Sequence, residues 1–302
     1  MISIYCSEKL DGVAAAAIIM RHAILTKLPA HFGGFLHPDA LEDEFEDMAQ
    51  NEQQLIFVLD IGALPEHLPL IEKITQKNKI VYWNTHDAES VIVPAKIFDR
   101  ATEKKCSAEL AQQRFLPNDL IARKLAQLAH EVTFWQMNDE NASRLSDLIA
   151  AGYNPLELID ALARGALWNP KFEDFHKKLI EKKMIAHDEL MKTLVIKSYV
   201  NYRFGFGLAA SILTTADACQ KILDGHAGVD VAVVLYRDGR IGFRRRDGCD
   251  VNVKELAALF KGGGMPFAAG ARLPMSVSKE NFPDALFYLD QAFKNFFVTA
   301  VS

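Results

Sequence analysis

The chain has 302 residues, half of them apolar and 24% charged, with a net charge of −5. This length is enough for two domains with cores of their own, and the composition argues against disorder, a basic nucleic-acid arm and an acidic tail. The four cysteines form no C-x-x-C pair, which argues against a zinc knuckle. The N-terminus lacks the features of a signal peptide, and no apolar run could span a bilayer, so we expect a cytoplasmic protein without a membrane partner.

The first half of the chain alternates β-rich apolar runs with helical patterns. This alternation predicts a mainly parallel sheet flanked by helices on both faces. The expected strands are residues 2–6, 31–35, 54–59 and 79–83, and the expected helices are residues 11–26 and 65–77.

Polar residues follow three of these strands. Asp11 comes shortly after the first, Asp60 directly after the third, and His86 and Asp87 after the fourth. In a parallel sheet the carboxyl ends of the strands share one edge, where ligands bind. Two carboxylates and an imidazole meeting there would form a divalent-metal site, although an aspartate after a strand is often only a helix cap.

The second half of the chain predicts a helical connector and then a smaller α/β domain. We expect domains at 1–195, including the connector, and at 203–302. The expected helices are residues 120–135, 142–151, 155–164, 172–194, 208–223 and 253–260, and the expected strands, joined by an Asp-Gly hairpin turn, are residues 229–236 and 241–245.

A glycine-rich segment follows the last of these helices. Gly262, Gly263 and Gly264 precede Met265 and a run of small residues, and such a loop either cradles an anion with its backbone N–H groups or packs tightly against another segment. Upstream, Arg244 is the first of three successive arginines on an expected strand. By alternation at least one of them should face the ligand site, while the others lie solvated on the opposite face.

The segment 262–270, Gly-Gly-Gly-Met-Pro-Phe-Ala-Ala-Gly, resembles the G-G-G-H-x-x-A-A-G motif of the DHHA1 domain. Residues 7–12 are similar to the H-x-D-x-D-G motif of DHH phosphoesterases, residues 58–62 match the second motif, and residues 85–87 occupy the place of Asp-His-His. The whole chain therefore resembles the DHH/DHHA1 phosphoesterase family, which includes RecJ-like and oligoribonuclease-like enzymes. The resemblance implies an N-terminal DHH domain and a C-terminal DHHA1 substrate-binding domain.

Several family positions are altered. Ser7 and Lys9 stand where the first motif has His and Asp, Thr85 and Asp87 flank His86 in the third, and Met265 replaces the DHHA1 histidine. The family uses two Mn²⁺ or Mg²⁺ ions, which activate water. The resemblance implies that Asp11, Asp60 and His86 hold one ion or none, that Asp87 is a further ligand or general base, and that Lys9 projects a cation toward the vacant second site.

Two functions follow from the resemblance. In the first, the chain binds short oligonucleotides or single-stranded nucleic acid in the interdomain cleft through Arg244, Gly262, Gly263, Gly264 and Met265, with weakened or lost hydrolysis. In the second, it is an active one-metal phosphodiesterase or exonuclease that releases mononucleotides, with Asp11, Asp60, His86, Asp87 and Lys9 as catalytic residues. Cyclic dinucleotides and polyphosphate are other substrates of the family, and a homodimer or a replication or repair protein are the expected protein partners.

Overall fold

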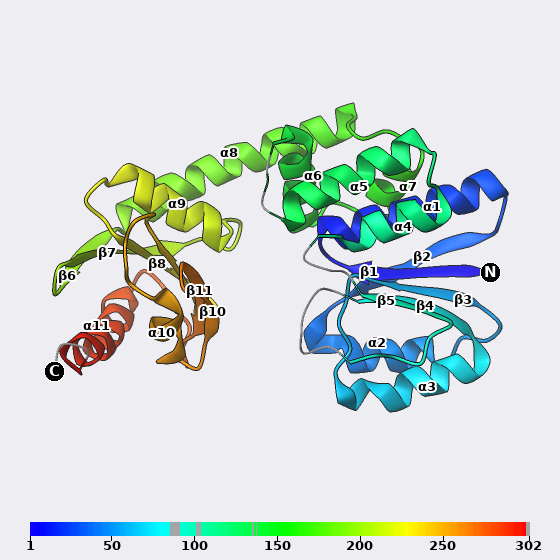
Figure 1. The fold of residues 1–302 in the computed structure, drawn as a ribbon. Helices are drawn as coiled ribbons and strands as arrows, with labels where there is room; N and C mark the ends of the chain where they lie inside the picture. The colour runs from blue at the N-terminus through cyan, green and yellow to red at the C-terminus, as the bar shows by residue number, and fades with distance from the viewer. Residues whose placement is uncertain (85–90, 101–103, 135, 137, 300–302) are drawn as a thin grey trace. The chain divides into compact units, whose positions relative to one another are not determined.

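The computed structural model describes residues 1–84, 91–100, 104–134, 136 and 138–299. It divides into two compact units, Met1–Lys177 and Lys178–Ser302, each with its own sheet (Figure 1). The division falls inside helix α8 (Pro170–Lys192), whereas the sequence assigned this whole helix to the first domain. None of the helices in the described ranges combines the length and apolar character that a membrane span requires.

The first unit contains a five-stranded, all-parallel sheet with strand order β2-β1-β3-β4-β5, as the alternation of strands and helices predicted. The central strands are almost entirely buried, as expected for a parallel sheet covered on both faces. The strands are β1 (Ile2–Ser7), β2 (Ala30–Leu36), β3 (Leu55–Leu59), β4 (Lys79–Asn84) and β5 (Ile97–Arg100).

Helices cover both faces of this sheet (Figure 1). The larger core lies on the side of α1, whose alanines pack closely against the neighbouring helices, and a second core lies under α2 and α3. The helices are α1 (Leu10–Thr26), α2 (Leu41–Met48), α3 (Leu68–Lys77), α4 (Ser107–Phe115), α5 (Leu120–Thr133), α6 (Glu140–Ala150) and α7 (Pro155–Ala163), with 3₁₀ turns at Pro38–Ala40 and Pro65–His67.

The second unit contains a six-stranded mixed sheet with strand order β10-β11-β9-β8-β7-β6, in which only β7 and β8 are parallel. Helix α9 and the end of α8 pack on one face of the sheet, and α10 and α11 pack on the other. The elements are β6 (Val195–Tyr199), β7 (Tyr202–Ala209), α9 (Thr215–Gly225), β8 (Val231–Tyr236), β9 (Arg240–Arg245), α10 (Val253–Ala258), β10 (Gly263–Met265), β11 (Ala268–Arg272) and α11 (Phe282–Thr299).

One sequence prediction in this unit was wrong. The helix expected at 208–223 begins only at Thr215, because residues up to Ala209 belong to strand β7. The glycine-rich segment, for which the sequence left an anion loop and tight packing open, forms a short edge strand at Gly263–Met265 that is paired antiparallel with β11. The hairpin between β8 and β9 is confirmed, with Gly239 at a positive φ of 85°.

Candidate metal and ligand sites

The first candidate site lies at the carboxyl ends of β1 and β3, which are neighbours in the sheet. Cys6 is paired with Leu59, so the next residues, Ser7 and Asp60, lie side by side, and the Ser7 hydroxyl donates a hydrogen bond to the Asp60 carboxylate. Gly12 lets α1 start directly against this edge, because a Cβ there would lie 2.6 Å from the Ser7 carbonyl oxygen. Asp11, in the first turn of α1, is thereby brought to Asp60.

Asp11 caps a helix from a distant part of the chain. Its two carboxylate oxygens accept hydrogen bonds from the backbone N–H groups of Ser107 (2.9 Å) and Ala108 (2.8 Å), in the first turn of α4. A helix N-terminus has unsatisfied N–H groups and a partial positive charge, so it favours a carboxylate there. Sequence reasoning missed this partner, although Cys106 and Glu109, which form a capping box, mark the start of α4.

Asp60 shares a buried environment with Asp11. Both residues are only 5% exposed, and they are close enough for the charge of Asp11 to act on Asp60. Burial, followed by the Asp11 charge, raises the pKa of Asp60 to about 8, against smaller opposing effects of Ser7 and Lys9. Burial also raises the pKa of Asp11, and the N–H groups of α4 oppose this shift. Burial and mutual repulsion therefore favour protonation of this pair relative to free aspartates.

The second candidate site lies on the face of the second sheet that carries α9. Arg244 is opposite Ala232 on one side and Ala268 on the other, and Ala268 is opposite Met265, so these four side chains share one face. Two residues along, Gly270 and Gly263 continue the same face, and little covers them: a Cβ on Gly263 would meet nothing within 4 Å. We call the exposed part of this surface, formed by Arg244, Gly263, Met265, Ala268 and Gly270, the β9–β11 shelf.

The three successive arginines have different roles. The Arg245 guanidinium donates to the carbonyls of Cys249 and Val251, and the Arg246 guanidinium donates to those of Leu223, His226 and Val229. The expectation that they are solvated was therefore wrong. Arg244 is half-buried, and its guanidinium makes no hydrogen bond or ion pair with any residue that the structure describes. Its charge is felt by Cys219 of α9, whose pKa burial raises to about 12 and Arg244 partly lowers.

The other glycines of the motif serve the hairpin. A Cβ on Gly262 would lie 2.2 Å from the Gly270 carbonyl oxygen, and one on Gly264 would lie 2.6 Å from the Ala269 Cα. Gly264 also has a φ of 139°, which side-chain-bearing residues rarely adopt. Met265 is 61% exposed at the end of β10. Close backbone packing therefore explains Gly262 and Gly264, and an approaching ligand could reach Gly263.

Comparison with solved structures identifies the fold, although no protein-family profile and no curated protein matches the sequence. The chain is similar to RecJ from Thermus thermophilus in complex with Mn²⁺, with a TM-score of 0.64 and 13% identity over 99% of this chain and 52% of that one. It is also similar to an exonuclease RecJ bound to manganese (TM-score 0.62, 13% identity, 98% and 90% covered) and to PggH, a pGpG-specific phosphodiesterase from Vibrio cholerae (TM-score 0.56, 12% identity, 97% and 99% covered). The chain has a RecJ-like DHH/DHHA1 fold. It spans about half the length of the Thermus RecJ chain.

Solved RecJ-like structures contain Mn²⁺, so the donors at the carboxyl edge can be tested for a metal. Among the described residues, no group of three or more His, Cys, Asp or Glu side chains could hold an ion. Of the described residues there, Asp11 already accepts from the N-terminus of α4 and Asp60 accepts from Ser7. Asp11 and Asp60 alone do not make up the donor set of a two-ion centre.

The remaining catalytic candidates from the sequence are His86, Asp87 and Lys9. His86 and Asp87, like Thr85, lie outside the described residues. Lys9 is exposed at the N-cap of α1 and makes no ion pair within the described part of the chain, although its charge lowers the pKa of Asp60. His37 after β2 and Glu8 after β1, which the sequence did not single out, approach to 3.9 Å between Nδ1 and Oε2.

Proposed function

We propose that this chain binds phosphate-containing ligands, namely short oligonucleotides or single-stranded nucleic acid, through Arg244 and the β9–β11 shelf, with weakened or lost hydrolysis. Arg244 is the observation that carries the proposal. It is a half-buried cation without a partner among the described residues, beside two arginines that are committed to backbone carbonyls. A guanidinium forms strong paired hydrogen bonds with phosphate oxygens, and an anion would give Arg244 the partner that the protein does not supply.

The surroundings of Arg244 suit a nucleotide chain better than a free anion. Gly263 and Gly270 leave exposed backbone along which a sugar–phosphate strand can lie. Phe267 lies two residues after Met265, in the turn before β11, and is 53% exposed. Its carbonyl accepts a hydrogen bond from the Arg245 N–H (3.1 Å). Aromatic side chains in such positions stack on bases with little sequence preference.

The carboxyl edge supports the weakened or lost hydrolysis. Metal-assisted hydrolysis requires ionised carboxylates whose lone pairs point at an ion. Here both carboxylate oxygens of Asp11 accept from the N-terminus of α4, and Asp60 accepts from Ser7, so an ion would have to compete with existing hydrogen bonds. In this proposal Asp11 serves as a helix cap for α4, and Asp60 is held by Ser7.

Binding is tested by fluorescence anisotropy with labelled five-nucleotide RNA and DNA in the presence of EDTA. Arg244→Ala should weaken binding about tenfold or more, since it removes a charged hydrogen-bonding partner of phosphate. The matched control is Arg164→Ala, which removes the same charge from an exposed position in the first unit and should bind within about twofold of the parent. Comparable binding by Arg244→Ala and the parent would exclude this site.

Hydrolysis is tested separately by Mn²⁺-dependent release of mononucleotides from the same oligomers. We expect no turnover above a buffer control. Turnover that disappears in Asp60→Ala would instead establish an active phosphodiesterase that uses Asp11 and Asp60, and the proposed loss of hydrolysis would be wrong. The binding proposal would still be decided by the anisotropy experiment.

A further inference from the structure

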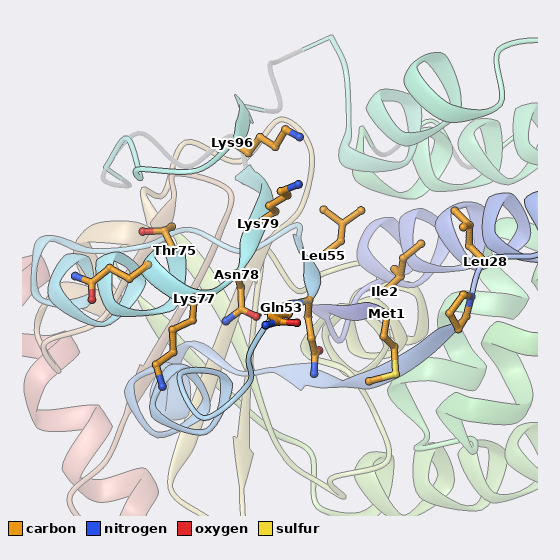
Figure 2. Close-up of a pocket in the computed structure, with 13 residues that line it drawn as sticks. Met1, Ile2, Leu28, Gln53, Leu55, Thr75, Lys77, Asn78, Lys79 and Lys96 are labelled. Atoms are coloured by element: carbon orange, nitrogen blue, oxygen red, sulfur yellow. Dashed lines mark hydrogen bonds between the residues drawn. The ribbon is translucent and has the colours of Figure 1, made fainter.

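The amino-terminal edge of the five-stranded sheet has a cavity of about 770 Å³ (Figure 2). Its walls come from the first residues of β1, β3 and β4, the chain between α1 and β2, the end of α3, and the residue before β5. Parallel strands all begin at one edge of a sheet and end at the other, so Asp11 and Asp60 lie at the opposite edge. The cavity is thus a separate site within the same unit.

The described residues that line this cavity include three lysines but no aspartate or glutamate. Lys77 is paired with Glu52, at 2.6 Å between Nζ and Oε1. Lys79 begins β4, Lys96 directly precedes β5, and neither makes an ion pair with a described residue. Figure 2 shows both ammonium groups pointing to the same side of the cavity. In a chain with a net charge of −5, this is a local excess of positive charge that an anion would neutralise.

One wall of the cavity is held in place by the side-chain amide of Asn78. Asn78 is buried; its Oδ1 accepts from the Gln54 N–H (3.0 Å) and its Nδ2 donates to the carbonyls of Asn51 (2.7 Å) and Ile74 (3.2 Å). These bonds fix the residues before β3 against the start of β4, so the cavity wall is formed before any ligand binds. Preformed sites lose less entropy on binding.

Other lining groups remain available to a ligand. The side chains of Gln53 and Gln76 are exposed and form no hydrogen bond within the part of the chain that the structure describes. Leu28 is 48% exposed and Leu55 is partly buried, and both give the cavity an apolar surface. Leu55 is paired with Lys79 in the sheet and lies beside it (Figure 2). The cavity therefore combines cations, amides and an apolar wall.

We propose that this cavity binds a nucleoside monophosphate. The phosphate lies between Lys79 and Lys96, the base packs against Leu28 and Leu55, and the Gln53 amide pairs with the edge of the base or with the sugar. Each part of such a ligand has a matching surface, and the volume lies within the ordinary range of about 300–1,000 Å³ for small-molecule sites. The site is independent of the β9–β11 shelf and of any hydrolysis.

Isothermal titration with AMP and UMP tests this assignment, with inorganic phosphate and adenosine as separate probes. The double variant Lys79→Gln/Lys96→Gln should bind either nucleotide about tenfold or more weakly than the parent. The control Lys73→Gln/Lys254→Gln removes two exposed charges that do not line the cavity, and it should bind like the parent. Arg244→Ala should also bind like the parent, which separates this site from the shelf.

Three results would overturn the proposal: no nucleotide binding to the parent, unchanged affinity in Lys79→Gln/Lys96→Gln, or loss of binding in Arg244→Ala. Inorganic phosphate that binds as tightly as AMP would reject the nucleotide and leave a simple anion site. Both lysines are exposed at strand starts, so the double variant should fold, and unchanged thermal unfolding verifies this.

Discussion

At the scale of single residues, the Asp11–Asp60 pair couples folding to pH. Asp60 is buried, and its pKa is raised to about 8, whereas an unfolded chain releases that proton near pH 4. Between these values the folded state holds a proton that the unfolded state lacks, so the free energy of unfolding falls as pH rises. One proton gives a slope of at most about 1.4 kcal/mol per pH unit, and the slope disappears above the folded pKa.

Asp60→Asn should make the free energy of unfolding nearly independent of pH in this range. The neutral amide imitates the protonated carboxyl and can still accept from Ser7, and asparagine tolerates the left-handed φ of 57° at this position. Urea unfolding at pH 5 to 8.5 in metal-free buffer should show a declining free energy of unfolding for the parent and a nearly constant one for the variant. Asp43→Asn, at an exposed site on α2, should keep the parental slope. Equal slopes in the parent and Asp60→Asn would mean that Asp60 is ionised in the fold.

The sequence could indicate part of this site. The strand ends predicted that Asp11 and Asp60 would converge, because parallel strands end at one edge. What the carboxylates bind could not be predicted, because the N-terminus of α4 is about a hundred residues away from Asp11 in the sequence and only the fold brings them together. Arg244 was singled out, but the reason that it differs from its neighbours lies in carbonyls contributed by other segments.

At the scale of elements, periodicity predicted the elements whose apolar pattern is continuous. Strand β7 was missed, because Gly205 and Gly207 interrupt its apolar run. Both glycines have packing roles: a Cβ on Gly205 would lie 2.8 Å from Ile222 of α9, and one on Gly207 would lie 2.6 Å from Leu190 of α8. Small residues in this strand let two helices approach the sheet, and a pattern based on hydrophobicity cannot register that contact.

Replacement of Gly263 and of Gly264 in the β10–β11 hairpin by alanine should change the free energy of unfolding by different amounts. Gly264→Ala should lower the free energy of unfolding by about 2 kcal/mol, because the new Cβ meets the Ala269 backbone at an unfavourable φ. Gly263→Ala should change it by less than about 0.5 kcal/mol, since its Cβ points into open space. Urea unfolding measures both. The same small cost for both variants would contradict the close packing of this hairpin.

At the scale of the whole molecule, the order of the motifs along the chain predicted the DHH/DHHA1 arrangement, which the fold confirms. Much of the core of the second unit was not predictable in the same way, because no element was expected after Gly270. That region contains α11, whose aromatic side chains fill the second core: Phe293 is fully buried and lies 5.7 Å from Phe204 and 6.3 Å from Phe243, between ring centroids.

Separate cores predict separate unfolding. All three tryptophans of the chain, Trp83, Trp135 and Trp168, fall within the first unit, so tryptophan fluorescence reports on that unit alone, whereas far-UV circular dichroism reports on both. Phe293→Ala should destabilise the second unit by about 3–5 kcal/mol and shift part of the dichroism transition to lower urea, leaving the fluorescence transition in place. Leu145→Ala, in the buried core of the first unit, should do the reverse and shift the fluorescence transition. A single transition that moves equally for both probes in both variants would contradict this prediction. It would show that the two cores unfold as one cooperative structure.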